Sequence, residues 1–263
     1  MRGNNRNGIA IQQRDRAFLK ELATFRVVDR EQAKIVGGFG STTRVNTRLL
    51  ALTRAGLLRR FFLGVTEGSR KAVYALSTKG AALVGVIPRG LRRPRNESLV
   101  ADFSVLHQLA VNNFYCELRR PNPGVSLSRW LSFHESLTQN LRLIPDGYFE
   151  LGTPAGTITA FLEVDLGHER PMVWAGKVRN YVQLALSGDF ERRFGRDQFR
   201  VLVVASSERR LLSIRKLVRI STQKIFWFAT LESVRCEGIF APVWLRPHGD
   251  ARQSLFPHLQ PLP

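Results

Sequence analysis

The chain has 263 residues, a formal net charge of +19 at pH 7 and a hydrophobic content of 44%. These values are typical of a globular protein with one large domain or two ordinary ones, and they exclude a mostly disordered or collagenous chain. No apolar run approaches the roughly 18 to 20 residues that cross a bilayer, and two distant cysteines, Cys116 and Cys236, form no disulfide framework. We therefore expect a cytoplasmic protein with no membrane partner.

The positive charge is concentrated near the N-terminus. Residues 1–100 contain 20 Lys and Arg against 6 Asp and Glu, whereas residues 101–263 contain 20 against 15. A field of this sign attracts polyanions, and the planar guanidinium of arginine suits phosphate groups and guanine edges. An arginine-rich genome would explain the many arginines but not the scarcity of acids in the first hundred residues. The charge distribution therefore predicts nucleic-acid binding, and together with the winged helix described next it makes double-stranded DNA the expected partner.

Three short helices and a hairpin are predicted over residues 13–77. Gln13–Thr24 carries apolar residues at near-helical spacing, Asp29 with Gln32 forms a capping box for a second helix, and Ser41 or Thr42 caps a third. Segments 57–64 and 71–77 are rich in β-forming residues and flank a turn at 66–69. This order is typical of a winged helix-turn-helix, in which the third helix enters the major groove and the hairpin touches the DNA backbone.

The third helix and the hairpin supply the expected DNA contacts. The candidates are Thr43, Arg44, Thr47 and Arg48 on the helix, with Arg70 and Lys71 at the hairpin. The alternative is that the arginines only solvate a small domain that binds protein. Residues 89–95, with four arginines among Gly, Leu and Pro, are typical of a linker. We therefore expect a DNA-binding domain over 1–88, a linker over 89–97, a second domain over 98–250 and a tail over 251–263.

The second domain alternates predicted helices and strands. Helices are predicted at 99–119, about 172–187 and 208–220, and β segments at 125–134, 143–151, 157–166, 199–205, 225–230 and 238–245. The pattern indicates one mixed sheet flanked by helices.

Three carboxylates are expected to meet in this sheet. Glu163 and Asp165 are two positions apart in one strand and project from the same face, and pairing with the preceding strand would bring Asp146 to them. Clustered carboxylates repel one another, and a hard cation such as Mg²⁺ or Mn²⁺ relieves the repulsion. A metal held by Asp146, Glu163 and Asp165 can activate water for attack on a phosphodiester.

These residues resemble the replication-relaxation family of plasmids and mobile elements. The likeness rests on the predicted winged helix followed by His107 in a long helix, Pro145-Asp146, Glu163-Val164-Asp165, and Lys177 four residues before Tyr181. The resemblance implies a winged helix-turn-helix ahead of a restriction-endonuclease-like α/β domain with a PD-(D/E)xK motif, thus an α+β/α/β chain. It also implies a role in replication, mobilisation or its control, with relaxase or replication proteins and a homodimer left open as partners.

One position departs from the nuclease motif. Asp165 stands where the motif has lysine, which normally orients the attacking water or stabilises the charge of the transition state. Lys177 on the following helix is the expected substitute. The expected catalytic residues of a Mg²⁺- or Mn²⁺-dependent nuclease are then Asp146, Glu163, Asp165 and Lys177.

A non-catalytic protein is the alternative left open. In that case the winged helix binds an operator or origin, and the second domain mediates dimerisation or partner docking. The acid cluster would then be satisfied by neighbouring arginines such as Arg142 or Arg170.

Overall fold

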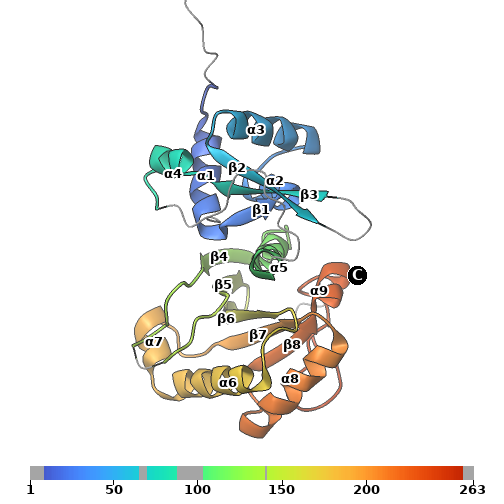
Figure 1. Cartoon of the computed structure of the whole chain (residues 1–263). Coiled ribbons are helices and arrows are strands. Elements are labelled where there is room, and N and C mark those ends of the chain that lie inside the picture. Colours follow the sequence, from blue (N-terminus) through green and yellow to red (C-terminus); the bar gives the residue numbers. More distant parts are fainter. Residues whose placement is uncertain (1–8, 65–69, 88–102, 140, 257–263) are drawn as a thin grey trace, which may run out of the picture. The chain divides into compact units, whose positions relative to one another are not determined.

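Two compact units make up the computed structural model, which describes residues 9–64, 70–87, 103–139 and 141–256 (Figure 1). The units divide between Cys116 and Glu117. The first contains a three-stranded sheet and the second an open five-stranded mixed sheet, so the chain is a mixed α/β protein. Within the described ranges, no helix combines the length and apolar character needed to cross a membrane.

The first unit combines helices with a small antiparallel sheet. Its helices are α1 (Gln13–Phe25), α2 (Arg30–Val36), α3 (Thr42–Arg54), α4 (Thr78–Val84) and most of α5 (Phe103–Leu118). Its strands are β1 (Val27–Asp29), β2 (Leu58–Gly64) and β3 (Arg70–Leu76), with β3 in the middle. The three helices and the two hairpin strands predicted over residues 13–77 are confirmed to within a few residues. The turn at 66–69 lies outside the described residues.

Side-chain caps explain where α2 and α3 begin. The Asp29 carboxylate accepts a hydrogen bond from the backbone N–H of Gln32 at 2.9 Å, and Gln32 Oε1 accepts one from the backbone N–H of Asp29 at 3.2 Å. This is the predicted capping box. Ser41 Oγ accepts from the backbone N–H of Arg44 at 3.3 Å and caps α3. Each cap gives a partner to an N–H that has none within its helix.

The long helix α5 packs within the first unit. Its Val105 and Leu109 join residues of β1, β2 and β3 in one apolar cluster. The Asn112 side chain donates to the carbonyls of Phe25 and Val27, at 3.2 and 2.6 Å. A second domain was expected from residue 98, whereas the second compact unit begins at Glu117, because Val105 and Leu109 of α5 pack with the first sheet. The expected linker at 89–97 lies outside the described residues.

The second unit is built on five strands that lie in chain order across the sheet. The strands are β4 (Ser126–Leu131), β5 (Gly147–Thr153), β6 (Gly156–Asp165), β7 (Arg200–Ala205) and β8 (Phe226–Thr230). β4, β5 and β6 pair antiparallel, and β6, β7 and β8 pair parallel. The helices are α6 (Pro171–Leu186), α7 (Asp189–Phe194), α8 (Glu208–Ser221) and α9 (Leu231–Glu237).

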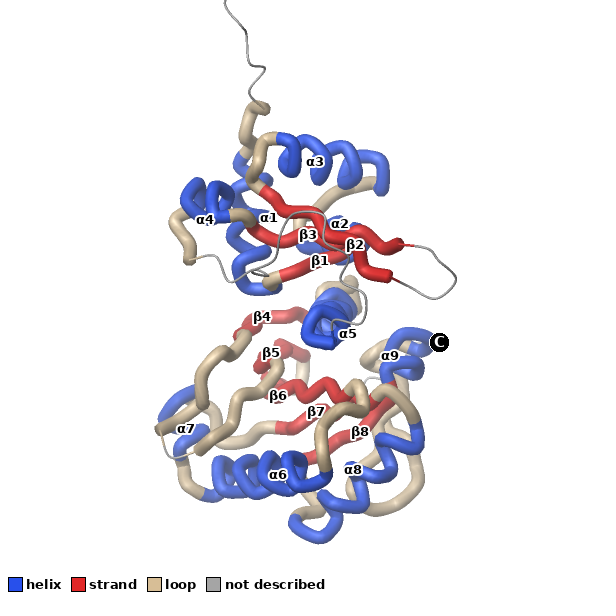
Figure 2. Tube along the Cα trace, in the orientation of Figure 1, coloured by secondary structure: helices blue, strands red, loops and turns tan. Residues whose placement is uncertain are grey.

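One face of this sheet is covered by α6 and α8, which lie side by side in Figure 2. Phe161 of β6 and Val203 of β7 pack there with Trp174 and Tyr181 of α6 and Ile214 of α8. Side chains alternate along a strand, so Glu163 and Asp165 lie on the same face of β6 as Phe161. Both therefore project toward α6.

The segment at 238–245 differs from its prediction. It forms no regular strand, and Leu245 makes only an isolated bridge with Phe228. Pro242 lies within the segment and has no N–H to donate to a sheet, which explains why the ladder does not continue.

Candidate functional site

Glu163 lies at the centre of a charged cluster between β6 and α6. Its side chain is fully buried. Glu163 Oε2 lies 2.8 Å from Lys177 Nζ, and Glu163 Oε1 accepts a hydrogen bond from the Tyr181 hydroxyl at 2.6 Å. Lys177 and Tyr181 are one helical turn apart on α6, so both reach the same carboxylate. The structure thus brings the predicted glutamate and the predicted substitute lysine together.

Asp146 joins this cluster through the backbone of β6. Its carboxylate accepts a hydrogen bond from the Val164 N–H at 2.7 Å, and its own N–H donates to the Leu162 carbonyl at 3.1 Å. This follows from the pairing of β5 with β6, in which Gly147 stands opposite Leu162. The negative charge of Asp146 acts on both Glu163 and Lys177.

Asp165 has different partners. Its carboxylate oxygens accept from the guanidinium of Arg210 on α8 at 2.7 and 2.8 Å. They also accept from the Trp174 indole N–H at 2.6 Å and the Gly167 N–H at 2.7 Å. Asp165 therefore ties the end of β6 to α6 and α8. Within the described ranges, no three Asp, Glu, His or Cys side chains are gathered so as to hold a metal ion, and the expected three-carboxylate group is not formed.

Glu169 is a member of the cluster that the sequence analysis did not identify. Its Oε1 lies 2.7 Å from Lys177 Nζ, while its Oε2 is buried without a hydrogen-bond partner among the described residues. Glu169 lies in the turn between β6 and α6, where no periodic pattern marks it. The one feature of the sequence that could have pointed to Glu169 is its position as an acidic residue just before the helix that carries Lys177.

The cluster carries an excess of negative charge. Burial raises the pKa of Glu163, Lys177 opposes the rise and Asp146 adds to it. Burial lowers the pKa of Lys177, but Glu163, Glu169 and Asp146 more than offset this, so the lysine stays protonated. Three carboxylates and one ammonium leave a formal charge of −2, whereas Asp165 and Arg210 balance each other. The unpartnered Glu169 Oε2 and this excess of negative charge are features that a divalent cation would satisfy, although no three such side chains of the described residues are gathered to hold one.

Two of the predicted DNA contacts on α3 differ sharply in their surroundings. Arg44 is exposed, as are Thr43 and Thr47. The guanidinium of Arg48 instead binds the buried Asp15 carboxylate, with Nε to Oδ1 at 2.7 Å, and donates to the Ala10 carbonyl at 2.7 Å. A buried carboxylate requires a cationic partner, so Arg48 does not share the exposed face of Arg44.

The hairpin residues are both exposed at the surface. Arg70 begins β3, and Lys71 Nζ lies 2.5 Å from the Asp29 carboxylate that caps α2. Beyond the C-terminal end of α3 there is also a hollow of about 520 Å³ that the sequence analysis did not identify. Its basic lining residues are Arg54, Arg59 and Lys79.

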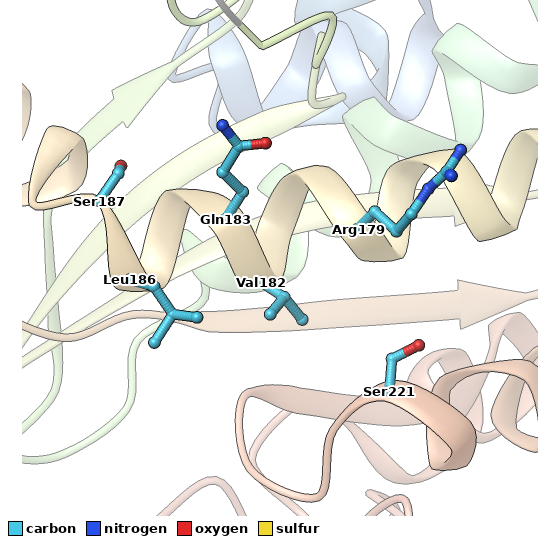
Figure 3. A pocket seen from close by; sticks show the side chains of 6 residues that line it. All are labelled: Arg179, Val182, Gln183, Leu186, Ser187 and Ser221. Carbon is cyan, nitrogen blue, oxygen red and sulfur yellow. The ribbon is translucent and has the colours of Figure 1, made fainter.

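A separate hollow of about 420 Å³ lies between α6 and the end of α8. Figure 3 shows Val182 and Leu186 of α6 on one side and Ser221 of α8 on the other. No carboxylate is among its lining residues, which are Arg179, Val182, Gln183, Leu186, Ser187 and Ser221. It therefore offers none of the predicted catalytic residues.

The two units together define a mixed α/β protein with a basic N-terminal unit and a carboxylate and lysine cluster in its second sheet. Residues 15–197 match the replication-relaxation family, which is well over half of the chain, so the protein belongs to this family. Membership indicates a role in the replication or relaxation of plasmids or mobile elements. Searches of curated proteins and of solved structures returned no match.

Proposed function

We propose that this protein binds double-stranded DNA of a plasmid or mobile element through its first unit and cleaves or nicks it through the cluster around Glu163. The contact of Lys177 with Glu163 at 2.8 Å carries the proposal. The strand position that holds lysine in the nuclease motif is Asp165 here, and a lysine from the next helix reaches the motif's glutamate instead. The second unit is then a restriction-endonuclease-like domain whose lysine has moved to α6.

The first unit is proposed to act as a winged helix-turn-helix. The support is its order of helices and strands, its antiparallel sheet and the exposed Thr43, Arg44 and Thr47 on α3. These residues would read the major groove, while Arg70 and Lys71 contact phosphates from the hairpin. Arg48 is assigned to stability because it neutralises Asp15.

Each residue of the cluster has a separate part in the proposed reaction. Asp146 and Glu163 would hold Mg²⁺ or Mn²⁺, which supplies water activation and stabilises developing charge when bound. The Lys177 ammonium places a fixed positive charge where the phosphodiester becomes more negative. The Tyr181 hydroxyl orients Glu163 by its hydrogen bond. Asp165 holds the frame through Arg210 rather than joining the ligands.

The test is conversion of supercoiled plasmid DNA to open-circular or linear DNA with Mg²⁺ or Mn²⁺. We expect Glu163→Gln and Asp146→Asn each to lower the cleavage rate by at least about 100-fold, a loss typical of removing one electrostatic group of an active site. Glu191→Gln, at an exposed position of α7, is the matched control and should cleave at the wild-type rate. Variants as active as the wild type would contradict the assignment.

A non-catalytic regulator is the second candidate, with the second unit serving dimerisation or docking of a relaxase or replication protein. It is favoured by the protein partners that the acids already have, namely Lys177 and Tyr181 for Glu163, and Arg210 for Asp165. A wild-type protein that cleaves no form of DNA and shows no rise in melting temperature with Mn²⁺ would establish this second candidate over the first.

A further inference from the structure

Arg200 at the start of β7 and Arg246, which follows the bridge residue Leu245, both stack on Trp227 of β8. The guanidinium carbon of Arg200 lies 4.7 Å from the centre of the Trp227 indole, and that of Arg246 lies 4.3 Å from it. Trp227 is only 6% exposed, and its Nε1 is buried without a hydrogen-bond partner among the described residues. A buried donor without an acceptor is rare in folded proteins, and it indicates a missing partner.

Within the part of the chain that the structure describes, the two guanidinium groups have no carboxylate partner. Arg200 donates to the Leu255 carbonyl at 2.7 Å, and Arg246 donates to the Lys224 carbonyl, but neither forms an ion pair within the described ranges. Burial lowers the pKa of both arginines, and repulsion from Arg246 adds to the effect on Arg200. The side chains at this place thus offer only donors and positive charge, which an anion would satisfy.

This arginine and tryptophan stack is separate from the cluster around Glu163. Phe226 and Phe228 pack on the face covered by α6 and α8, so Trp227 between them projects from the opposite face. Arg200 begins β7 opposite Ala160, whereas Asp165 stands opposite Ala205 at the other end of the same strand pairing. The stack also lies outside residues 15–197, which the family match covers.

We propose that Arg200, Arg246 and the indole N–H of Trp227 bind a phosphate group. Guanidinium groups donate in pairs to phosphate oxygens, and stacking on the indole holds both in place. A tetrahedral anion presents enough acceptor oxygens to serve two guanidinium groups and the indole together, which a planar carboxylate with two oxygens does less well. The source is either the backbone of a DNA strand or free phosphate. The site goes beyond the proposed cleavage and does not require it.

The test is a nuclear magnetic resonance titration of the full chain, which follows the indole N–H signals of its four tryptophans. The Trp227 signal is assigned by its loss in Trp227→Phe. One arm adds inorganic phosphate at constant ionic strength, and the other adds a DNA oligonucleotide without terminal phosphates. We expect the chemical shift of the Trp227 indole N–H to change as ligand is added and to reach a plateau when the site is saturated. Arg200→Gln or Arg246→Gln should weaken the apparent affinity by roughly tenfold or more, as loss of a charge-assisted hydrogen bond does.

The controls separate this proposal from the others. Arg235→Gln removes the same charge from an exposed position of α9 and should leave the titration unchanged. Glu163→Gln should also leave it unchanged, so failure of cleavage and failure of phosphate binding are distinguishable. If the Trp227 signal shifts with the DNA oligonucleotide but not with inorganic phosphate, the ligand is a phosphodiester of the DNA backbone. If it shifts with both, the site binds a phosphate group from either source. No shift in either arm, or an equal shift in a folded Arg200→Gln, Arg246→Gln double variant, overturns the site.

Discussion

Asp165 is the residue on which β6, α6 and α8 converge. It is 1% exposed and accepts hydrogen bonds from Arg210, Trp174 and Gly167. Burial raises the pKa of its carboxyl, but these hydrogen bonds and the charge of Arg210 more than offset the rise, so the pKa lies below its ordinary value of 3.8. The ionised form is therefore the one that stabilises the fold.

This gives a prediction for Asp165→Asn. The stability from a lowered pKa is present above pH 3.8 and is lost as pH falls through the pKa of the folded protein. We expect Asp165→Asn to lower the free energy of unfolding by about 2 to 3 kcal/mol at pH 7, since it leaves a half-buried Arg210 without its counter-ion. The difference from wild type should narrow as the pH is lowered below 3.8.

Urea unfolding followed by circular dichroism at several pH values measures this difference. Asp189→Asn is the matched control, because Asp189 pairs with the exposed Arg192 at the surface, and it should have little effect at any pH. A constant difference between Asp165→Asn and wild type across the acidic range would exclude the pKa as its origin.

The residues of the cluster were predictable to different extents. Glu163 and its neighbour Asp165 follow from the alternation of a strand, whereas Lys177 was expected from the resemblance to the nuclease motif. The partners of Asp165 did not follow, because Arg210 is 45 residues away in the chain and only the parallel pairing of β6 with β7 brings α8 to it. Glu169 was missed for a related reason, since a turn has no period from which a side-chain direction can be inferred.

At the scale of elements, the sequence predicted the long helices from their repeated apolar spacing and the short α2 from its capping box, but it did not predict α4, α7 and α9. α1, α3, α6 and α8 contain 13 to 16 residues, enough for the spacing to appear several times. α4, α7 and α9 contain 6 or 7 residues and depend on local caps and turns. The packing of α5 could not be predicted either, because the apolar residues of a helix do not reveal which of two sheets they pack against.

On α3, the contrast between Arg44 and Arg48 gives a second prediction. Arg44→Ala should weaken DNA binding and reduce the slope of log affinity against log salt by about one unit if Arg44 contacts a phosphate, with little loss of stability. Arg48→Ala should instead lower the free energy of unfolding by about 3 kcal/mol, because it leaves the buried Asp15 unpaired. Fluorescence anisotropy with labelled duplex DNA and urea unfolding measure the two effects.

Asn46→Ala, at another exposed position of α3, serves as a control for the stability measurement. The assignment of Arg44 to DNA binding and Arg48 to stability is contradicted if Arg48→Ala has the same urea midpoint of unfolding as the wild type. It is also contradicted if Arg44→Ala loses as much stability as Arg48→Ala.

At the scale of the whole molecule, the uneven charge predicts where DNA affinity resides. The excess of 20 basic over 6 acidic residues in positions 1–100 should make duplex binding strongly dependent on salt. We expect a fragment of residues 1–118, which retains α5, to keep most of the affinity, and residues 117–263 to bind duplex DNA at least about 100-fold more weakly, since few phosphate contacts would remain. Titrations at several salt concentrations test this. Equal affinity of the two fragments would place the DNA-binding surface in the second unit.

The hydrogen bond between Trp174 and Asp165 also sets the rotation of α6 about its own axis. Trp174 lies one turn before Lys177, and Tyr181 lies one turn after Lys177. The Lys177 ammonium is 5.1 Å from the centre of the Trp174 indole ring, whose N–H donates to Asp165. A lysine on the strand would be fixed to Glu163 by the backbone, whereas a lysine on a helix can be displaced by a small turn of that helix. Asp165 therefore fixes the rotation of α6 and, with it, the position of Lys177 against Glu163.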